Sequence, residues 1–82
     1  MMQREDYAVR LKELVNRMVT SDVTVDVDSD LVEDVGLSSV EIMELVEQLE
    51  DTYDISFPLN DLAEVRTIRD LAAHLDQLVS KR

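Results

Sequence analysis

The 82-residue chain contains no cysteine and no tryptophan, and it has one glycine, one proline and one histidine. Without cysteine, neither a disulfide framework nor a thiolate metal site can form. The chain also lacks long uninterrupted apolar runs, so we expect no membrane-spanning helix, no signal-peptide core and a cytoplasmic location. Because 45% of its residues are nevertheless apolar, the chain is too hydrophobic to be interpreted as disordered.

Basic residues are scarce, and they are missing altogether from the middle of the chain. Eight Lys and Arg oppose 19 Asp and Glu, which gives a formal net charge of −11. Residues 18–65 hold fourteen acids and no base, so we expect these acids to lack compensating bases. Such a chain should be repelled by nucleic acid and by anionic membranes. We interpret the central stretch as an anionic surface for partners with basic patches, rather than as a face that is merely solvated.

The sequence offers little from which to build a catalytic centre. Its single histidine, His74, falls in the last predicted helix, and no base can be paired with a recognisable nucleophile. We therefore expect the protein not to be an enzyme and interpret His74 as a surface or boundary residue.

Acidic residues at alternate positions suggest one metal-binding alternative, a calcium loop. Asp26, Asp28 and Asp30 have the spacing of the first three ligands of an EF-hand. A loop that starts at Asp26 requires Gly at its sixth position and Glu at its twelfth, where this chain has Leu31 and Leu37. We therefore predict no specific metal site.

Hydrophobic spacing predicts helices and little else. Apolar residues recur at intervals of three and four in residues 4–19, in residues 39–53 and from Ile68 to Val79. Pro58 marks the start of a short helix that continues to about Val65. Residues 20–38 are predicted to form a long loop that Val and Leu side chains, Val23 among them, hold against the core. The expected fold is all-α, a single domain over residues 1–82 with three main helices and one short helix.

The start of the second main helix can be read from a local motif. Ser38-Ser39-Val40-Glu41 fits a capping box, in which the Ser38 hydroxyl accepts a hydrogen bond from the Glu41 backbone N–H. The Glu41 carboxylate in turn accepts one from the Ser38 N–H. Ser38 is then the helix cap, and Ser39 is the first helical residue.

One side of this helix is predicted to be acidic. On a helical wheel, apolar residues from Ile42 to Tyr53 share the buried side, and carboxylates fill the opposite half. Val40 and Met43 interrupt the acidic half, and we interpret Val40 as an apolar anchor whose charged neighbours steer partners toward it. The predicted docking residues are Val40, Glu41, Met43, Glu44, Glu47, Glu50 and Asp51.

The residues around this helix start carry a resemblance to a known family. Residues 33–41 read EDVGLSSVE and are followed by the acidic helix. This arrangement resembles the acyl carrier proteins of fatty-acid and polyketide synthesis, in which a serine three positions after a glycine carries 4'-phosphopantetheine. The resemblance extends over nearly the whole chain and implies the acyl-carrier four-helix fold. Matching Gly36 to the family's glycine implies that Ser39 carries the phosphopantetheine through a phosphodiester.

The resemblance also implies how the protein works and with what. Acyl intermediates would be held as thioesters on the phosphopantetheine arm, and in the family the acyl chain can fold back between the helices. The implied partners are a phosphopantetheinyl transferase and acyl-transferring, ketosynthase or ligase enzymes with basic docking patches. We expect the carrier itself to be a monomer that binds no nucleic acid and inserts into no membrane.

The chain departs from the family pattern on both sides of Ser39. Ser38 stands where the family usually has Asp, and Val40 stands where it usually has Leu. Ser38 can keep the capping role of Asp but not its charge, so transferase recognition would need another acid such as Glu41, or a dedicated transferase. Two alternatives remain: an aminoacyl or peptidyl carrier, which usually has a less acidic helix, and an unmodified acidic protein-interaction module.

Overall fold

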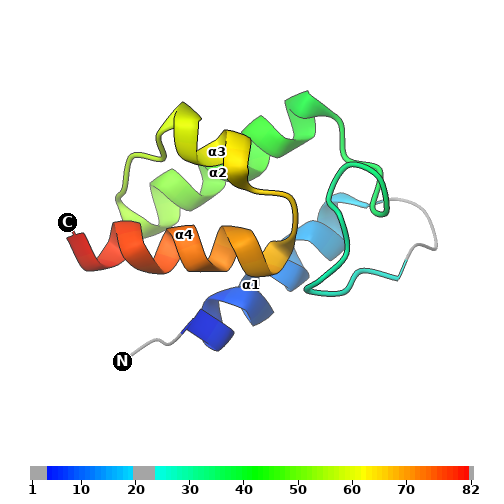
Figure 1. The fold of residues 1–82 in the computed structure, drawn as a ribbon, viewed down its shortest axis with the longest axis horizontal. Coiled ribbons are helices and arrows are strands. Elements are labelled where there is room, and N and C mark those ends of the chain that lie inside the picture. Colours follow the sequence, from blue (N-terminus) through cyan, green and yellow to red (C-terminus); the bar gives the residue numbers. More distant parts are fainter. Residues whose placement is uncertain (1–3, 20–23, 82) are drawn as a thin grey trace.

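The computed structural model describes residues 4–19 and 24–81, and this part of the chain is helical (Figure 1). It contains no strand, only an isolated β-bridge between Asp30 and Thr67. The all-α expectation, with three main helices and one short helix, is confirmed. The prediction for Val23 lies outside the described residues. The helices are α1 (Arg4–Met18), α2 (Ser39–Tyr53), α3 (Leu59–Glu64) and α4 (Ile68–Lys81).

The C-terminal helix α4 is central to the packing. It packs along α1, and the short helix α3 lies against it as well, so that Figure 1 shows α4 between α1 below and α3 above. Leu11 of α1, Leu45 of α2 and Leu75 of α4 are all fully buried in one core. Burying a leucine side chain stabilises the fold by about 1.5–3 kcal/mol, so this shared core is what holds the helices together. No helix in the described part of the chain is both long enough and apolar enough to cross a membrane.

The start of α4 is capped as its sequence suggests. The Thr67 hydroxyl accepts a hydrogen bond from the Asp70 N–H at 3.1 Å, and the Asp70 carboxylate accepts one from the Thr67 N–H at 3.2 Å. The same carboxylate oxygen also accepts from the Arg66 N–H at 3.2 Å. These bonds satisfy donors at the helix end that have no partner inside the helix, which fixes where α4 begins.

The loop between α1 and α2 is fastened to the start of α4. The Leu31 N–H donates to the Arg66 carbonyl at 2.8 Å, and the Arg69 N–H donates to the Val27 carbonyl at 2.9 Å. The expectation that Val and Leu side chains pin this loop to the core is confirmed for four of its described residues, whereas Val32 is 56% exposed. Those that are buried are Val25, Leu31, Val35 and Leu37.

Two arginines near the start of α4 pair with acids of this loop. The Arg69 guanidinium donates to both carboxylate oxygens of Asp28, at 2.7 and 3.2 Å, which lowers the pKa of Asp28 and raises that of Arg69. Arg66 Nε lies 3.6 Å from Asp30 Oδ2. The expectation that the acids of residues 18–65 lack compensating bases is therefore wrong for these two. Residues distant in sequence supply the positive charge.

Asp30 organises the turn that precedes α2. Its Oδ1 accepts hydrogen bonds from the backbone N–H groups of Glu33, at 3.0 Å, and Val32, at 2.9 Å, and these bonds lower the pKa of Asp30. Its backbone carbonyl accepts from the N–H groups of Asp34, at 3.0 Å, and Val35, at 2.9 Å. One residue thus closes the turn with both its side chain and its main chain.

Replacing Asp30 with Asn should destabilise the fold in a pH-dependent way, because the charged carboxylate is the stronger hydrogen-bond acceptor. The folded-state pKa of Asp30 lies below its unfolded value of about 3.9, so its contribution is fully present above that pH and is lost as the pH falls through the folded pKa. We expect the Tm deficit of Asp30→Asn to be clear at pH 7 and to shrink toward pH 3 in thermal melts followed by circular dichroism.

The exposed acid Glu44 provides the control for loss of a negative charge. Glu44→Gln should leave the Tm at pH 7 unchanged or slightly raised, because it relieves repulsion on α2. A deficit in Asp30→Asn that is equally large at both pH values would show that the charge of Asp30 contributes nothing.

Candidate functional site

The capping box predicted at the start of α2 is present. The Glu41 N–H donates to the Ser38 hydroxyl at 3.2 Å, and the Ser38 N–H donates to Glu41 Oε1 at 3.0 Å. Ser38 has an extended backbone, with φ −78° and ψ 167°, and Ser39 is the first helical residue. The two adjacent serines therefore differ: the hydroxyl of Ser38 is engaged in the cap, whereas Ser39 presents its side chain on the surface.

The only glycine in the sequence lies three residues before Ser39. Gly36 has φ +85°, a conformation that costs an L-residue with a side chain free energy but costs glycine little. The next residue, Leu37, is 3% exposed and donates its N–H to the Leu31 carbonyl at 2.9 Å. The turn at Gly36 therefore sends Leu37 into the core and brings Ser38 and Ser39 to the surface.

The surroundings of Ser39 suit a covalently attached phosphodiester. The N–H groups of Ser39 and Val40 belong to the first turn of α2, where an α-helix supplies no acceptor for them. Free N–H groups and the helix dipole make this end of α2 electropositive, which favours a phosphate. The Ser39 side chain is exposed, so a bulky arm can be attached without displacing the core. The residues present therefore fit 4'-phosphopantetheine.

A mixed apolar and acidic stripe runs along α2 from this point. Val40 and Met43 are 65% and 42% exposed, and Glu44, Glu47 and Asp51 are exposed as well. Their spacing of three and four residues places them on one face of the helix. We call these five residues the docking stripe. It lies on the solvent side of α2, opposite the buried Leu45, Val46 and Leu49.

Two of the predicted docking acids have structural roles instead of facing only solvent. Glu41 completes the capping box with Ser38. Glu50 is half-buried, and its Oε2 accepts a hydrogen bond from the Phe57 N–H at 2.9 Å, which ties the chain after α2 back to the helix. The acidic side of α2 is thus divided between carboxylates that satisfy backbone donors and carboxylates that remain available.

Two clefts among the described residues are lined by α2, and they lie at different ends of this helix. A cavity of about 200 Å³ is lined by Ile42 in the first turns of α2, close in sequence to Ser39. Its other walls are Asp30, Leu31, Val32, Glu33, Val65 and Arg66. Most of this lining is aliphatic, so an apolar group can enter it.

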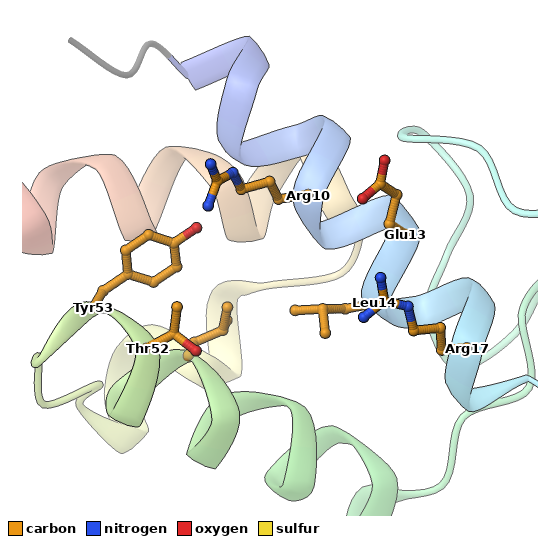
Figure 2. Close-up of a pocket in the computed structure, with 7 residues that line it drawn as sticks. Arg10, Glu13, Leu14, Arg17, Thr52 and Tyr53 are labelled. Atoms are coloured by element: carbon orange, nitrogen blue, oxygen red, sulfur yellow. The ribbon is translucent and has the colours of Figure 1, made fainter.

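The second cleft, of about 350 Å³, separates α1 from the C-terminal end of α2 (Figure 2). Arg10 and Arg17 of α1 line it opposite Tyr53 of α2. Although it is the larger cleft, it lies at the far end of α2 from Ser39, so we assign it no part in the chemistry of the serine. The remaining lining residues are Glu13, Leu14, Leu49 and Thr52.

One cluster was not anticipated from the sequence, which predicted no metal site. His74 Nδ1 lies 3.8 Å from Asp61 Oδ2, and His74 Nε2 lies 3.8 Å from Glu64 Oε2. The spacing of Asp61 and Glu64 indicates that they share a face of α3. Nothing in the linear sequence indicated that His74 of α4 would lie against that face.

Comparisons with known proteins identify the family that the chain is similar to. Residues 9–75 match the family described as "Phosphopantetheine attachment site". The chain is 35% identical over 69 residues to an acyl carrier protein from Rhodococcus erythropolis, covering 84% of this chain and 74% of that one. It is 40% identical over 60 residues to the anthracycline acyl carrier protein DpsG from Streptomyces peucetius, covering 70% and 71%.

The fold has a solved counterpart too. A structure described as a candidate acyl carrier protein from Mycobacterium tuberculosis superposes with a TM-score of 0.76, covering 87% of this chain and 96% of that one. At 22% identity this likeness shows the shared fold alone.

Ser38 and Ser39 can be distinguished by stability before any modification is tested. Ser38→Ala removes an N-cap and should lower the free energy of unfolding by about 1 kcal/mol, within a range of about 0.5–2. Ser39→Ala alters an exposed side chain and should change it by less than about 0.5 kcal/mol. Urea denaturation followed by circular dichroism measures both. Equal losses in the two variants would contradict the assignment of the cap to Ser38.

Proposed function

Because this chain belongs to the acyl carrier protein family, whose phosphopantetheine attachment domain it contains, we propose that Ser39 is the residue that carries the arm. The observation that supports this most directly is the contrast between the two serines of the capping box. Ser38 uses its hydroxyl to cap α2, whereas Ser39 presents an exposed side chain in the first helical turn. The family's spacing of three residues from the glycine also leads from Gly36 to Ser39.

The protein itself presents and orients the arm and does not catalyse the acyl-transfer steps. When attached, the arm supplies the thiol on which an acyl group is held as a thioester. The Ser38–Glu41 capping box fixes the first turn of α2, and so fixes where the Ser39 oxygen lies. The free N–H groups of that turn stabilise the negative charge of a phosphodiester beside them. No neighbouring base is required, because in the family the transferase activates the serine.

Partner enzymes are proposed to bind at the docking stripe. Glu44, Glu47 and Asp51 attract basic patches over distances of about a Debye length, which speeds encounter and makes it sensitive to salt. Val40, next to Ser39, then provides an apolar contact that sets the register of the complex. The proposed partners are a phosphopantetheinyl transferase and acyl-transferring, ketosynthase or ligase enzymes.

The cargo is proposed to be an acyl group rather than an aminoacyl or peptidyl group. The acids of the docking stripe are exposed and have no basic residue within their own helix, in keeping with the strongly acidic helix of acyl carriers. The cavity bordered by Ile42 and Val65 has a mainly aliphatic lining that suits a short apolar chain. The names of the relatives, which include an anthracycline acyl carrier protein, support an acyl cargo.

The attachment site is tested by mass. Incubation with coenzyme A and a broad-specificity phosphopantetheinyl transferase should increase the intact mass of the wild type by one phosphopantetheine group. Ser39→Ala should gain nothing, because it has lost the accepting oxygen. Ser38→Ala is the matched control and should still be loaded. A gain on Ser39→Ala as large as that on the wild type would overturn the site assignment.

The role of Val40 is tested by introducing a negative charge at its position. Val40→Asp should lower kcat/KM for loading by the transferase about tenfold, or about 1.4 kcal/mol, because it places a carboxylate where an apolar contact is expected. Val9→Asp on α1 is the control, since Val9 is similarly exposed, at 57% against 65%. Urea melts should show little change in either variant. A large loss of stability in Val40→Asp would instead place Val40 in the core.

A further inference from the structure

The cluster formed by Asp61, Glu64 and His74 brings together two residues of α3 and one of α4. Each residue offers one ligand atom, and the three atoms lie within 4.8 Å of one another. Both ring nitrogens of His74 face a carboxylate oxygen, each at 3.8 Å. Two carboxylates from one helix therefore converge on the single histidine of the chain.

The imidazole is held in place while the carboxylates remain free to adjust. The His74 side chain is 20% exposed, and its ring lies 6.3 Å, centroid to centroid, from that of the buried Phe57. The side chains of Asp61 and Glu64 are 36% and 73% exposed. Because the nitrogen ligand is fixed and the two oxygen ligands are mobile, the carboxylates can move toward a bound ion without a rearrangement of the helices.

The helix that supplies the carboxylates needs a further attachment. None of the six residues of α3 is buried, whereas α2 and α4 each bury several. A helix this short has little stability of its own, because nucleation costs more than a few backbone hydrogen bonds return. A contact across the α3–α4 interface would therefore have a large effect on how firmly α3 is held.

We propose that Asp61, Glu64 and His74 bind one divalent transition-metal ion, zinc being the best match, which fastens α3 to α4. A mixed set of one imidazole and two carboxylates suits zinc and its neighbours, whereas calcium and magnesium prefer oxygen ligands alone. Zinc lies about 2.0–2.2 Å from such ligands, and tetrahedral angles place its ligand atoms about 3.3–3.6 Å apart. An imidazole binds one ion through one nitrogen, so the carboxylate beside the other nitrogen of His74 must swing toward the ion. The exposure of Asp61 and Glu64 leaves room for that movement. Water would complete the coordination.

The position of α3 gives the ion a consequence for the carrier. Val65 directly follows α3 and lines the 200 Å³ cavity together with Ile42 of α2. An ion that holds α3 against α4 would restrict movement of this part of the cavity lining. The inference does not depend on loading of Ser39, so either proposal can fail without the other.

Calorimetric titration of the metal-free, untagged full chain with zinc chloride at fixed ionic strength tests the site. We expect one ion per chain, with binding weakened at least about tenfold in both His74→Gln and Glu64→Gln. Glu64→Gln changes a mostly exposed side chain, so it keeps the test valid even if His74→Gln is unstable. Asp51→Asn is the matched control, because it removes one exposed acid of the docking stripe and should leave zinc binding unchanged.

The single histidine makes a second readout specific. Imidazole signals in proton NMR can come only from His74, and substoichiometric zinc should shift or broaden them while the same concentration of magnesium should not. Three results would each overturn the proposal: no zinc binding by the wild type, undiminished binding by His74→Gln and Glu64→Gln, or a loss in Asp51→Asn as large as that in Glu64→Gln. The third result would show that zinc is attracted only to the overall negative charge of the chain and not to this cluster.

Discussion

The placement of Ser39 depends on how the irregular segment before α2 is held against the bundle. Two backbone hydrogen bonds, Leu31 to Arg66 and Arg69 to Val27, tie this segment to the residues that begin α4. Fixing a loop backbone costs about 1–2 kcal/mol of conformational entropy per residue, so the ordered conformation needs such contacts and buried side chains to offset the cost. Because Leu31 and Leu37 are buried, the turn at Gly36 places Ser39 on the surface, facing solvent.

The need for acceptors for backbone N–H groups outside the regular helix bonds explains why the acids of this protein are not equivalent. Asp30, Glu41, Glu50 and Asp70 each accept hydrogen bonds from backbone N–H groups in a turn, at a helix start or just beyond a helix. These carboxylates are structural, and their charge is an advantage because a charged acceptor makes the stronger bond. For the exposed acids of the docking stripe, the described part of the chain provides no such backbone partner, so their mutual repulsion is not offset within the fold. Binding to a basic partner would offset it.

Much of this arrangement was predictable because it is local. Helix periodicity and the Ser38–Glu41 capping box depend on residues close to each other in the sequence, and the structure confirms both. The pairing of Asp28 with Arg69 joins residues 41 apart, and no periodic pattern signals it. The cluster around His74 has the same origin, since it depends on how α3 lies on α4. Pairings across the fold are decided by packing, which a single sequence does not display.

The division of charge along the chain has a physical reason that the net value of −11 conceals. Bases within α2 could pair with its own acids at a spacing of three or four residues and would cancel the field in front of the docking stripe. Arg66 and Arg69 neutralise acids of the loop, and they do so from the start of α4. Two loop acids, Asp28 and Asp30, are thus compensated where the loop is fastened to the bundle, whereas α2 contains no base that could pair with its own acids. If partner enzymes bind at the docking stripe as proposed, this separation favours fast encounter, because a stripe neutralised by its own bases would lose electrostatic steering.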